Sequence, residues 1–131
     1  MDEPELNREE LLATLEWVEA HREVLDMGHF IDIDDYDVDT VCMADAEGCG
    51  TTACFAGWHV LRRGMCLSRQ AKVVTPEGRT VLAGGTPVGA GHWAWKDLGL
   101  TEVEMTLLFF DTDETGLRRV VEGIMDGRYR E

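Results

Sequence analysis

Residues 49–63, CGTTACFAGWHVLRR, contain the pattern that decides the fold. The small residues of this stretch share one face of a helical wheel: Ala53, Ala56 and Gly57. A helix that is apolar on nearly all sides usually lies in the middle of a domain, and a face of small residues lets a neighbouring element approach closely. Gly64 follows two arginines, which suit the negative end of a helix dipole. We therefore predict a central helix over residues 52–63, capped by Thr51 or Thr52.

The segment before this helix predicts a second, amphipathic helix. Asn7 and Glu10 stand at the N-cap and N3 positions of a capping box, and Gly28 stands where a helix would end. Apolar residues recur at helical spacing between these signals: Leu11, Leu15, Val18 and Leu25. The opposite face is acidic, with Glu9, Glu16, Glu19 and Glu23. We expect the central helix to pack against the apolar face of this helix.

The remaining segments predict loops and one hairpin. Residues 29–50 read as a loop, in which the acidic run from residue 32 to residue 39 suits either an irregular edge strand or an ordered loop. Residues 71–83 hold two β-prone runs joined by turn residues at 76–78, which favours a β-hairpin. Residues 84–92 are rich in glycine and read as a loop.

Helical signals return near the C-terminus. A short helical turn is expected over residues 93–98, where Gly99 ends it. Thr101 and Glu104 form a second capping box and begin a further helix. The last helix carries its apolar residues at i, i+3, i+4 and i+7: Leu117, Val120, Val121 and Ile124. The predicted fold is mainly α, of the α+β class, with about four helices and one β-hairpin in a single domain over residues 1–131.

Charge and composition narrow the classes of function. The net charge is −14, and residues 1–48 alone hold 16 acids and 2 bases. Such a surface disfavours direct binding to nucleic acid and to anionic membranes. No apolar run is long enough to span a membrane, and the first residues do not resemble a signal peptide. We therefore expect a cytoplasmic protein whose four cysteines are thiols: Cys42, Cys49, Cys54 and Cys66.

Two stretches resemble a family of bacterial and phage proteins. CGTTACFAGW at residues 49–58 is similar to a CGTxACxAGW-type segment of small uncharacterised proteins from actinobacteria and their phages. LGLTEVEMTLLFF at residues 98–110 is similar to a stretch near the C-terminus of the same proteins. The resemblance implies the cytosol of an actinobacterium or of its phage-infected host, and it implies no activity.

One enzymatic alternative uses a cysteine nucleophile. Cys54 is placed in the first turn of the predicted central helix, where the helix dipole lowers the pKa of a thiol. His92 would then have to come close through the fold and act as the general base. A cysteine among alanine, phenylalanine and glycine is more often a small buried apolar residue. We predict no catalytic residue, and a cysteine-dependent hydrolase using Cys54 and His92 stays the alternative.

A third alternative is a module stabilised by a metal. The four cysteines and His59 lie within 25 residues, but only Cys49 and Cys54 have the spacing of a zinc ligand pair. Residues 111–122 match an EF-hand calcium loop in part, with a threonine and an arginine at atypical positions. A turn that caps the last helix explains the same residues. We predict no metal and no cofactor.

The acidic first third predicts the function that we favour. We expect residues 9–39 to form one negative face that binds another, host protein through its basic surface, as a non-enzymatic accessory protein does. The expected contact residues are Glu16, Glu19, Glu23, Asp32, Asp34, Asp35, Asp37 and Asp39. An acidic surface that only keeps the protein soluble is the alternative interpretation. The sequence indicates neither the partner nor the oligomeric state.

Overall fold

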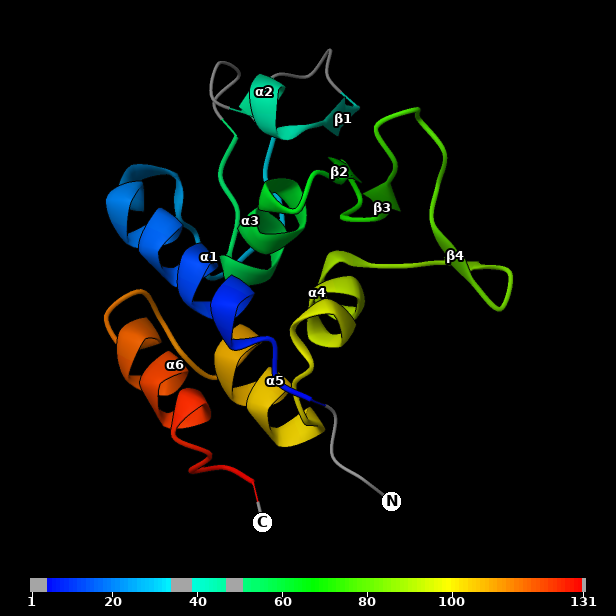
Figure 1. The fold of residues 1–131 in the computed structure, drawn as a ribbon. Helices are drawn as coiled ribbons and strands as arrows, with labels where there is room; N and C mark the ends of the chain where they lie inside the picture. The colour runs from blue at the N-terminus through cyan, green and yellow to red at the C-terminus, as the bar shows by residue number, and fades with distance from the viewer. Residues whose placement is uncertain (1–4, 34–38, 47–50, 131) are drawn as a thin grey trace.

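The computed structural model describes residues 5–33, 39–46 and 51–130, and Figure 1 shows their arrangement. Five of the helices in these residues have eight or more residues: α1 (Arg8–Ala20), α3 (Phe55–Arg62), α4 (Ala90–Leu98), α5 (Glu102–Phe109) and α6 (Leu117–Met125). The 3-10 helix η1 (Arg22–Val24) and the short helix α2 (Met43–Ala46) complete the set. None of the helices in the described ranges is long and apolar enough to cross a membrane.

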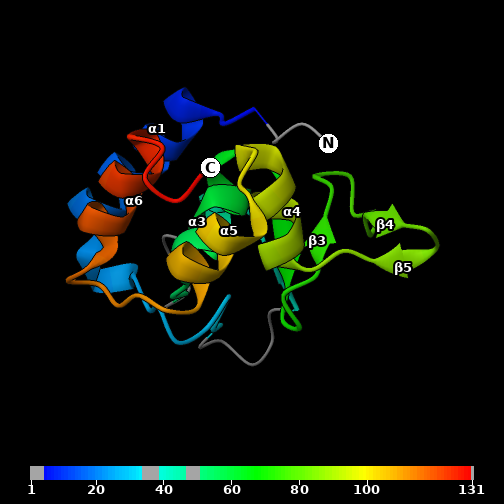
Figure 2. The ribbon, with the colours of Figure 1, turned by 90° about the horizontal axis from the view of Figure 1, so that it is seen from below.

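The strands form two small antiparallel sheets. The first has the order β1 (Thr40–Val41), β2 (Cys66–Ser68) and β3 (Val73–Val74). The second is a hairpin of β4 (Leu82–Ala83) and β5 (Thr86–Pro87), which extends away from the helices (Figures 1 and 2). The class is therefore α+β as predicted, with more helices and strands than the sequence indicated.

Helix α3 lies in the middle of the helices, as predicted. It packs against α1, α4 and α5, and Figure 2 shows it enclosed by them. Every residue of α3 before Arg62 is buried. One hydrophobic core gathers side chains of α3 with those of the four other long helices, including Leu11, Leu98, Leu108 and Ile124.

The N-terminus of α3 differs from the prediction. The helix begins at Phe55 with Cys54 as its N-cap, three residues later than expected. Thr52 is extended and exchanges two backbone hydrogen bonds with Asp32, of 2.8 and 2.9 Å. The amide of Ala53 donates to the carbonyl of Val24 at 3.0 Å. The backbone N–H and C=O groups of residues 52 and 53 thus form hydrogen bonds with residues 24 and 32, and not within a longer helix.

Helix α1 begins as predicted and ends early. The Asn7 side chain accepts a hydrogen bond from the Glu10 amide at 3.3 Å, which confirms the N-cap. The helix stops at Ala20, not near Gly28, and η1 follows it. Leu25 therefore does not belong to the apolar face of α1, because it pairs as an extended residue with Ala53.

The segment after η1 crosses α3 at very short range. A Cβ atom added to Gly57 would lie 2.0 Å from the carbonyl oxygen of Phe30. No side chain fits into that gap, so glycine is required at this position by the close approach of two backbones. The small-residue face predicted for the central helix is thus the surface on which the chain near Phe30 lies.

The turn predicted at residues 76–78 is present, but its strands pair differently. The Thr75 amide donates to the Arg79 carbonyl at 2.8 Å, and Val74 forms a single bridge with Thr80. The expected loop over residues 84–92 is wrong. Gly84 and Gly85, both with positive φ, form the turn between β4 and β5, and α4 begins at Ala90.

The C-terminal helices agree better with the sequence. Thr101 and Glu104 form the complete capping box of α5. Gly99 ends α4 in the left-handed conformation, with φ of 69°. The Glu104 carboxylate is fully buried, and the Arg130 guanidinium contacts both of its oxygens at 2.9 Å. This ion pair attaches the end of the chain to α5.

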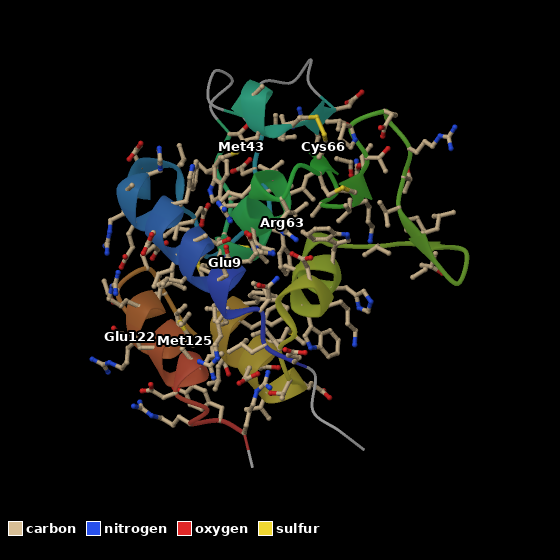
Figure 3. All side chains as sticks on the ribbon, in the orientation of Figure 1. Glu9, Met43, Arg63, Cys66, Glu122 and Met125 are labelled. Atoms are coloured by element: carbon tan, nitrogen blue, oxygen red, sulfur yellow. A yellow bond between two sulfur atoms is a disulfide. The ribbon has the colours of Figure 1, made fainter. Side chains whose placement is uncertain are left out.

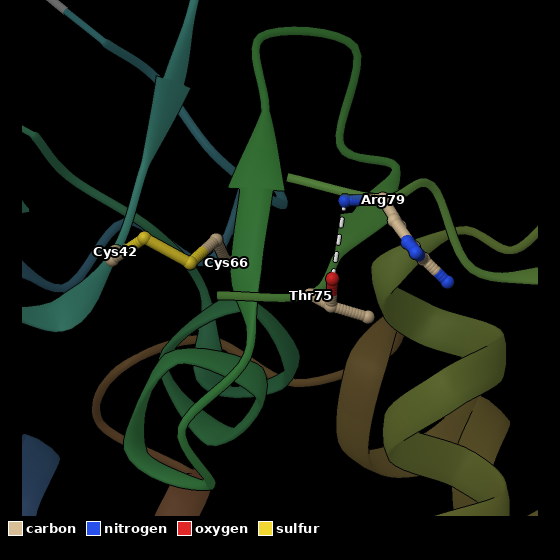
Figure 4. The surroundings of a disulfide bond; sticks show 4 residues. All are labelled: Cys42, Cys66, Thr75 and Arg79. Carbon is tan, nitrogen blue, oxygen red and sulfur yellow. Dashed lines mark hydrogen bonds between the residues drawn. A yellow bond between two sulfur atoms is a disulfide. The ribbon is translucent and has the colours of Figure 1, made fainter. Parts of the chain in front are cut away.

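Two of the four expected thiols form a disulfide. Cys42 and Cys66 are joined, with their Cα atoms 4.3 Å apart (Figure 4). The pairing of β1 with β2 explains this, because one further step in their register places Cys42 opposite Cys66. The prediction of reduced thiols is wrong for this pair, since it rested on an assumed compartment. Cys54 is free as expected, and Cys49 lies outside the described residues.

We expect Gly57→Ala to lower the free energy of unfolding by about 3 kcal/mol, because the added methyl group overpacks a contact between backbones. Gly89→Ala is the matched control, because its new Cβ would meet only the Ala71 carbonyl at an ordinary 3.9 Å. That change should cost about 1 kcal/mol or less, because Gly89 is the N-cap of α4 and alanine is disfavoured at an N-cap. Urea denaturation of both variants tests this, and equal losses would contradict the close approach at Gly57.

We expect the disulfide to stabilise the fold by about 3 kcal/mol, since it closes a loop of 24 residues in the unfolded chain. Denaturation of the oxidised protein and of the Cys42→Ser/Cys66→Ser variant gives the difference. Mass spectrometry after alkylation in denaturant without reductant should find Cys42 and Cys66 unmodified. Alkylation of both residues would show that the pair is not formed in the isolated protein.

Candidate functional site

A buried polar network joins three helices in the core. His59 of α3 is fully buried, and its ring contacts two side chains. Its Nε2 atom lies 2.7 Å from Oδ2 of Asp97 in α4, and its Nδ1 atom lies 2.8 Å from Oγ1 of Thr14 in α1. The single histidine of α3 therefore connects the central helix to both of its neighbours.

The Asp97 carboxylate decides which nitrogen of His59 carries hydrogen. An ionised carboxylate only accepts, so Nε2 carries the ring hydrogen and donates to Asp97. Nδ1 then accepts from the Thr14 hydroxyl, whose oxygen in turn accepts from Nη1 of Arg62 at 2.8 Å. Nε of Arg63, labelled in Figure 3, donates to the same Asp97 oxygen at 3.0 Å. Within the described residues, no buried side-chain nitrogen or oxygen lacks a partner.

The electrostatics of the network favour a neutral ring beside an ionised carboxyl group. Burial lowers the pKa of His59, and this effect outweighs the raising effect of Asp97. The hydrogen bond from His59 and the one from Arg63 lower the pKa of Asp97 despite its partial burial. His59 therefore stays unprotonated at a pH where an exposed histidine carries charge.

This network is built for packing. A hydroxyl, an imidazole and a carboxylate in contact are also the parts of a hydrolase triad. Thr14 and His59, however, are both fully buried, so a substrate cannot reach the hydroxyl. In the sequence, His59 is a candidate zinc ligand and is badly placed as a base for Cys54, and helical spacing does not indicate its two partners.

Cys54 does not have the properties of a nucleophile. Its side chain is 2% exposed, which confirms the expected buried thiol. Burial raises the pKa of this thiol to about 11, although backbone amides of α3 act in the opposite direction. His92, the base of the enzymatic alternative, is exposed and contacts the Trp95 ring edge-on, with centroids 5.7 Å apart. The site thus provides neither a thiolate nor a base beside it.

The candidate zinc ligands do not converge in the described residues. Cys42 and Cys66 are consumed by the disulfide, and His59 is occupied by Thr14 and Asp97. Cys54 remains as a single buried thiol. These residues therefore offer no zinc site.

The possible calcium loop is a turn, as the alternative predicted, but no side chain of the turn caps α6, whose N-cap is Gly116. Oδ1 of Asp113 accepts hydrogen bonds from the amides of Thr115 and Gly116, at 3.1 and 3.0 Å. Glu122, labelled in Figure 3, lies on the surface of α6, where Arg118 approaches its carboxylate to 3.6 Å. The carboxylate of Asp113 is thus used by its own backbone, and Glu122 pairs along its helix.

One cluster that the sequence analysis missed lies after η1. Ligand atoms of Asp26, His29 and Asp32 all fall within 4.8 Å of one another. Oδ2 of Asp26 lies 2.9 Å from Nδ1 of His29, and this contact raises the pKa of the imidazole. Exposed carboxylates gather in this way on acidic surfaces without an ion, so we assign no metal site here.

The predicted acidic contact residues divide into three groups. Glu16, Glu23, Asp32 and Asp39 are exposed. Glu19 is engaged by the Arg118 guanidinium, which lowers the pKa of its carboxyl group through a hydrogen bond. Three residues lie outside the described part of the chain: Asp34, Asp35 and Asp37. One continuous negative face over residues 9–39 therefore stays a prediction, and the charge of Glu19 within it is compensated.

Two hollows mark the surface near α5. A groove of about 310 Å³ lies along the outer side of α5, and Glu102 and Asp111 stand at its ends. A second pocket, of about 380 Å³, lies at the N-terminus of α4. Volumes in this range are typical of binding sites.

Known proteins offer no guide to these surfaces. The chain matches no protein-family model, no curated protein and no solved structure. The similarity to actinobacterial and phage proteins therefore stays a prediction, and the function has to be inferred from the residues themselves.

Proposed function

We propose that this protein is a non-enzymatic accessory protein, of actinobacterial or phage origin, that binds another protein with a basic surface. We further propose that the outer side of α5 is the centre of the contact. The observation that carries the proposal is the apolar surface that α5 leaves on its outer side, at Val103 and Leu107, although Leu108 and Phe109 already fill its core side.

The inner side of α5 is well packed. Leu108 and Phe109 are buried, and the helix contacts α3 and α6. On its outer side, Val103 is 57% exposed, and Leu107 lines the same groove. A helix with apolar residues on several faces is normally covered on each of them. A partner that covers Val103 and Leu107 would remove this apolar surface from water.

Charge identifies the chemistry of the partner. The two titratable residues that line the α5 groove are acidic: Glu102 and Asp111. Lysine or arginine side chains at the rim of a partner would pair with them, around an apolar centre. A nucleic acid would bring phosphates to these carboxylates, and so would an anionic membrane.

The exposed acids of α1 and its continuation support a second role. Glu16 and Glu23 are exposed. A net charge of −14 creates a field that attracts a basic protein before contact and speeds its association. The acidic residues then act on the rate of encounter, while the α5 groove determines how long the complex lasts.

We expect Val103→Asp to weaken binding of the partner by about tenfold or more, since it places a charge in the apolar centre of the contact. Leu82→Asp is the matched control, because Leu82 is 58% exposed and lies on the separate β4–β5 hairpin. The partner is first captured from an actinobacterial lysate and identified by mass spectrometry. Its dissociation constant is then measured with purified proteins.

The proposal requires a partner with a basic surface whose affinity falls as salt rises from 50 to 500 mM, because exposed charges are screened. Both variants should keep the melting temperature of the unchanged protein, since each substitution is on the surface. Equal loss of binding in Val103→Asp and Leu82→Asp would contradict a contact at α5. An affinity that does not depend on salt would contradict the basic partner.

A further inference from the structure

The pocket at the N-terminus of α4 is lined by three large aromatic residues among smaller and polar ones. The three are Phe30, Trp95 of α4 and Phe110. The Phe30 and Phe110 rings meet edge-on, with centroids 5.8 Å apart. Flat apolar walls of this kind accept a flat apolar group.

Packing and a hydrogen bond hold these walls in place. Nε1 of Trp95 donates to the Leu100 carbonyl at 2.8 Å. The Phe30 ring rests on Gly91, where an added Cβ would lie 2.9 Å from the ring. The backbone of Phe30 is in turn pressed against Gly57 in the core. The pocket is therefore formed by the fold itself, so binding of a ligand does not require the free-energy cost of ordering these side chains.

The polar groups of the pocket favour an anion. Lys72 and His92 line it, and none of its lining residues is acidic. This is unusual in a chain of net charge −14. At the start of α4, the amides of Gly91 and His92 have no hydrogen-bond partner among the described residues. Free amides and the positive end of the helix dipole add to the charge of Lys72.

The backbone beside these groups is held in an uncommon conformation. Ala71, also in the pocket wall, has φ of 62°, the one positive φ of a non-glycine residue in the described chain. Its carbonyl accepts a hydrogen bond from the Ala90 amide at 2.8 Å. This bond fixes the start of α4 against the segment that carries Lys72, so the cationic side chain and the helix N-terminus border one cavity.

We propose that this pocket binds a small organic anion with a flat apolar body, of the class of aromatic carboxylates and sulfonates. The aromatic body lies between Phe30 and Trp95, and the anionic group lies beside Lys72 and the first amides of α4. This site is separate from the acidic α5 groove and does not depend on the proposed protein partner.

The probe is 8-anilinonaphthalene-1-sulfonate, an aromatic anion whose fluorescence rises on binding. N-phenyl-1-naphthylamine, which has the same rings and no sulfonate, is the neutral control probe. Titrations of each probe are followed at constant ionic strength in the unchanged chain and in two charge-reversed variants. These are Lys72→Glu in the pocket and Arg79→Glu at the turn after β3, which does not line the pocket. Both residues are exposed, and both variants change the net charge equally.

We expect saturable binding of the sulfonate probe at one site per chain, with about five- to tenfold weaker affinity in Lys72→Glu and unchanged affinity in Arg79→Glu. The neutral probe should bind more weakly and respond to neither variant. Two-dimensional NMR spectra should show chemical-shift changes when the sulfonate probe is added. We expect them at the backbone amides of Gly91 and His92 and at the indole of Trp95.

Four results would overturn the proposal. The first is the absence of saturable binding by the sulfonate probe, and the second is an equal loss of affinity in both variants. The third is neutral-probe affinity as high as that of the sulfonate. The fourth is a set of shifts confined to residues away from α4. Unchanged melting temperatures show that the variants are folded, so each of these results bears on the pocket itself.

Discussion

The hydrogen bond between His59 and Asp97 is the contact on which the packing of the helices depends. An imidazole at the centre of an otherwise apolar helix is costly unless both of its nitrogens have partners. Asp97 supplies one partner from α4, and Thr14 supplies the other from α1. Those two helices can therefore occupy only the positions, relative to α3, that satisfy the ring. A second constraint on α3 is steric. Gly57 has no side chain, and this allows the backbone of Phe30 to pack directly against the helix.

Local signals in the sequence predicted the parts of the fold that depend on neighbouring residues. The capping box of Thr101 and Glu104 and the N-cap of Asn7 are contacts across three residues, and both are present. The predicted start of α3 was wrong because Thr52 pairs with Asp32, twenty residues away. The Cys42–Cys66 bond depends on strand pairing that no spacing rule indicates. The partners of His59 could not be predicted from the sequence for the same reason, since Thr14 and Asp97 lie 45 and 38 residues from it.

The candidate surfaces were less predictable than the core. Acidic charge was evident in the composition, but the pairing of Glu19 with Arg118 required the packing of α1 on α6. The α5 groove and the α4 pocket lie close together and differ in charge, with carboxylates in one and basic side chains in the other. Phe30 links both the pocket and the core, because its ring is in the wall and its backbone is against α3. The core thus shapes the surface on which binding is proposed.

The most direct test of this account is the protonation state of His59, measured from ring ¹⁵N chemical shifts as the pH falls from 8 to 5. His29 is an internal reference, because its exposed ring has a pKa raised by Asp26, whereas burial lowers the pKa of His59. The account predicts that His59 stays neutral, with hydrogen on Nε2, after His29 has become protonated. A His59 ring that carries hydrogen on Nδ1 alone, or that is protonated at or above the pH of His29, would contradict it.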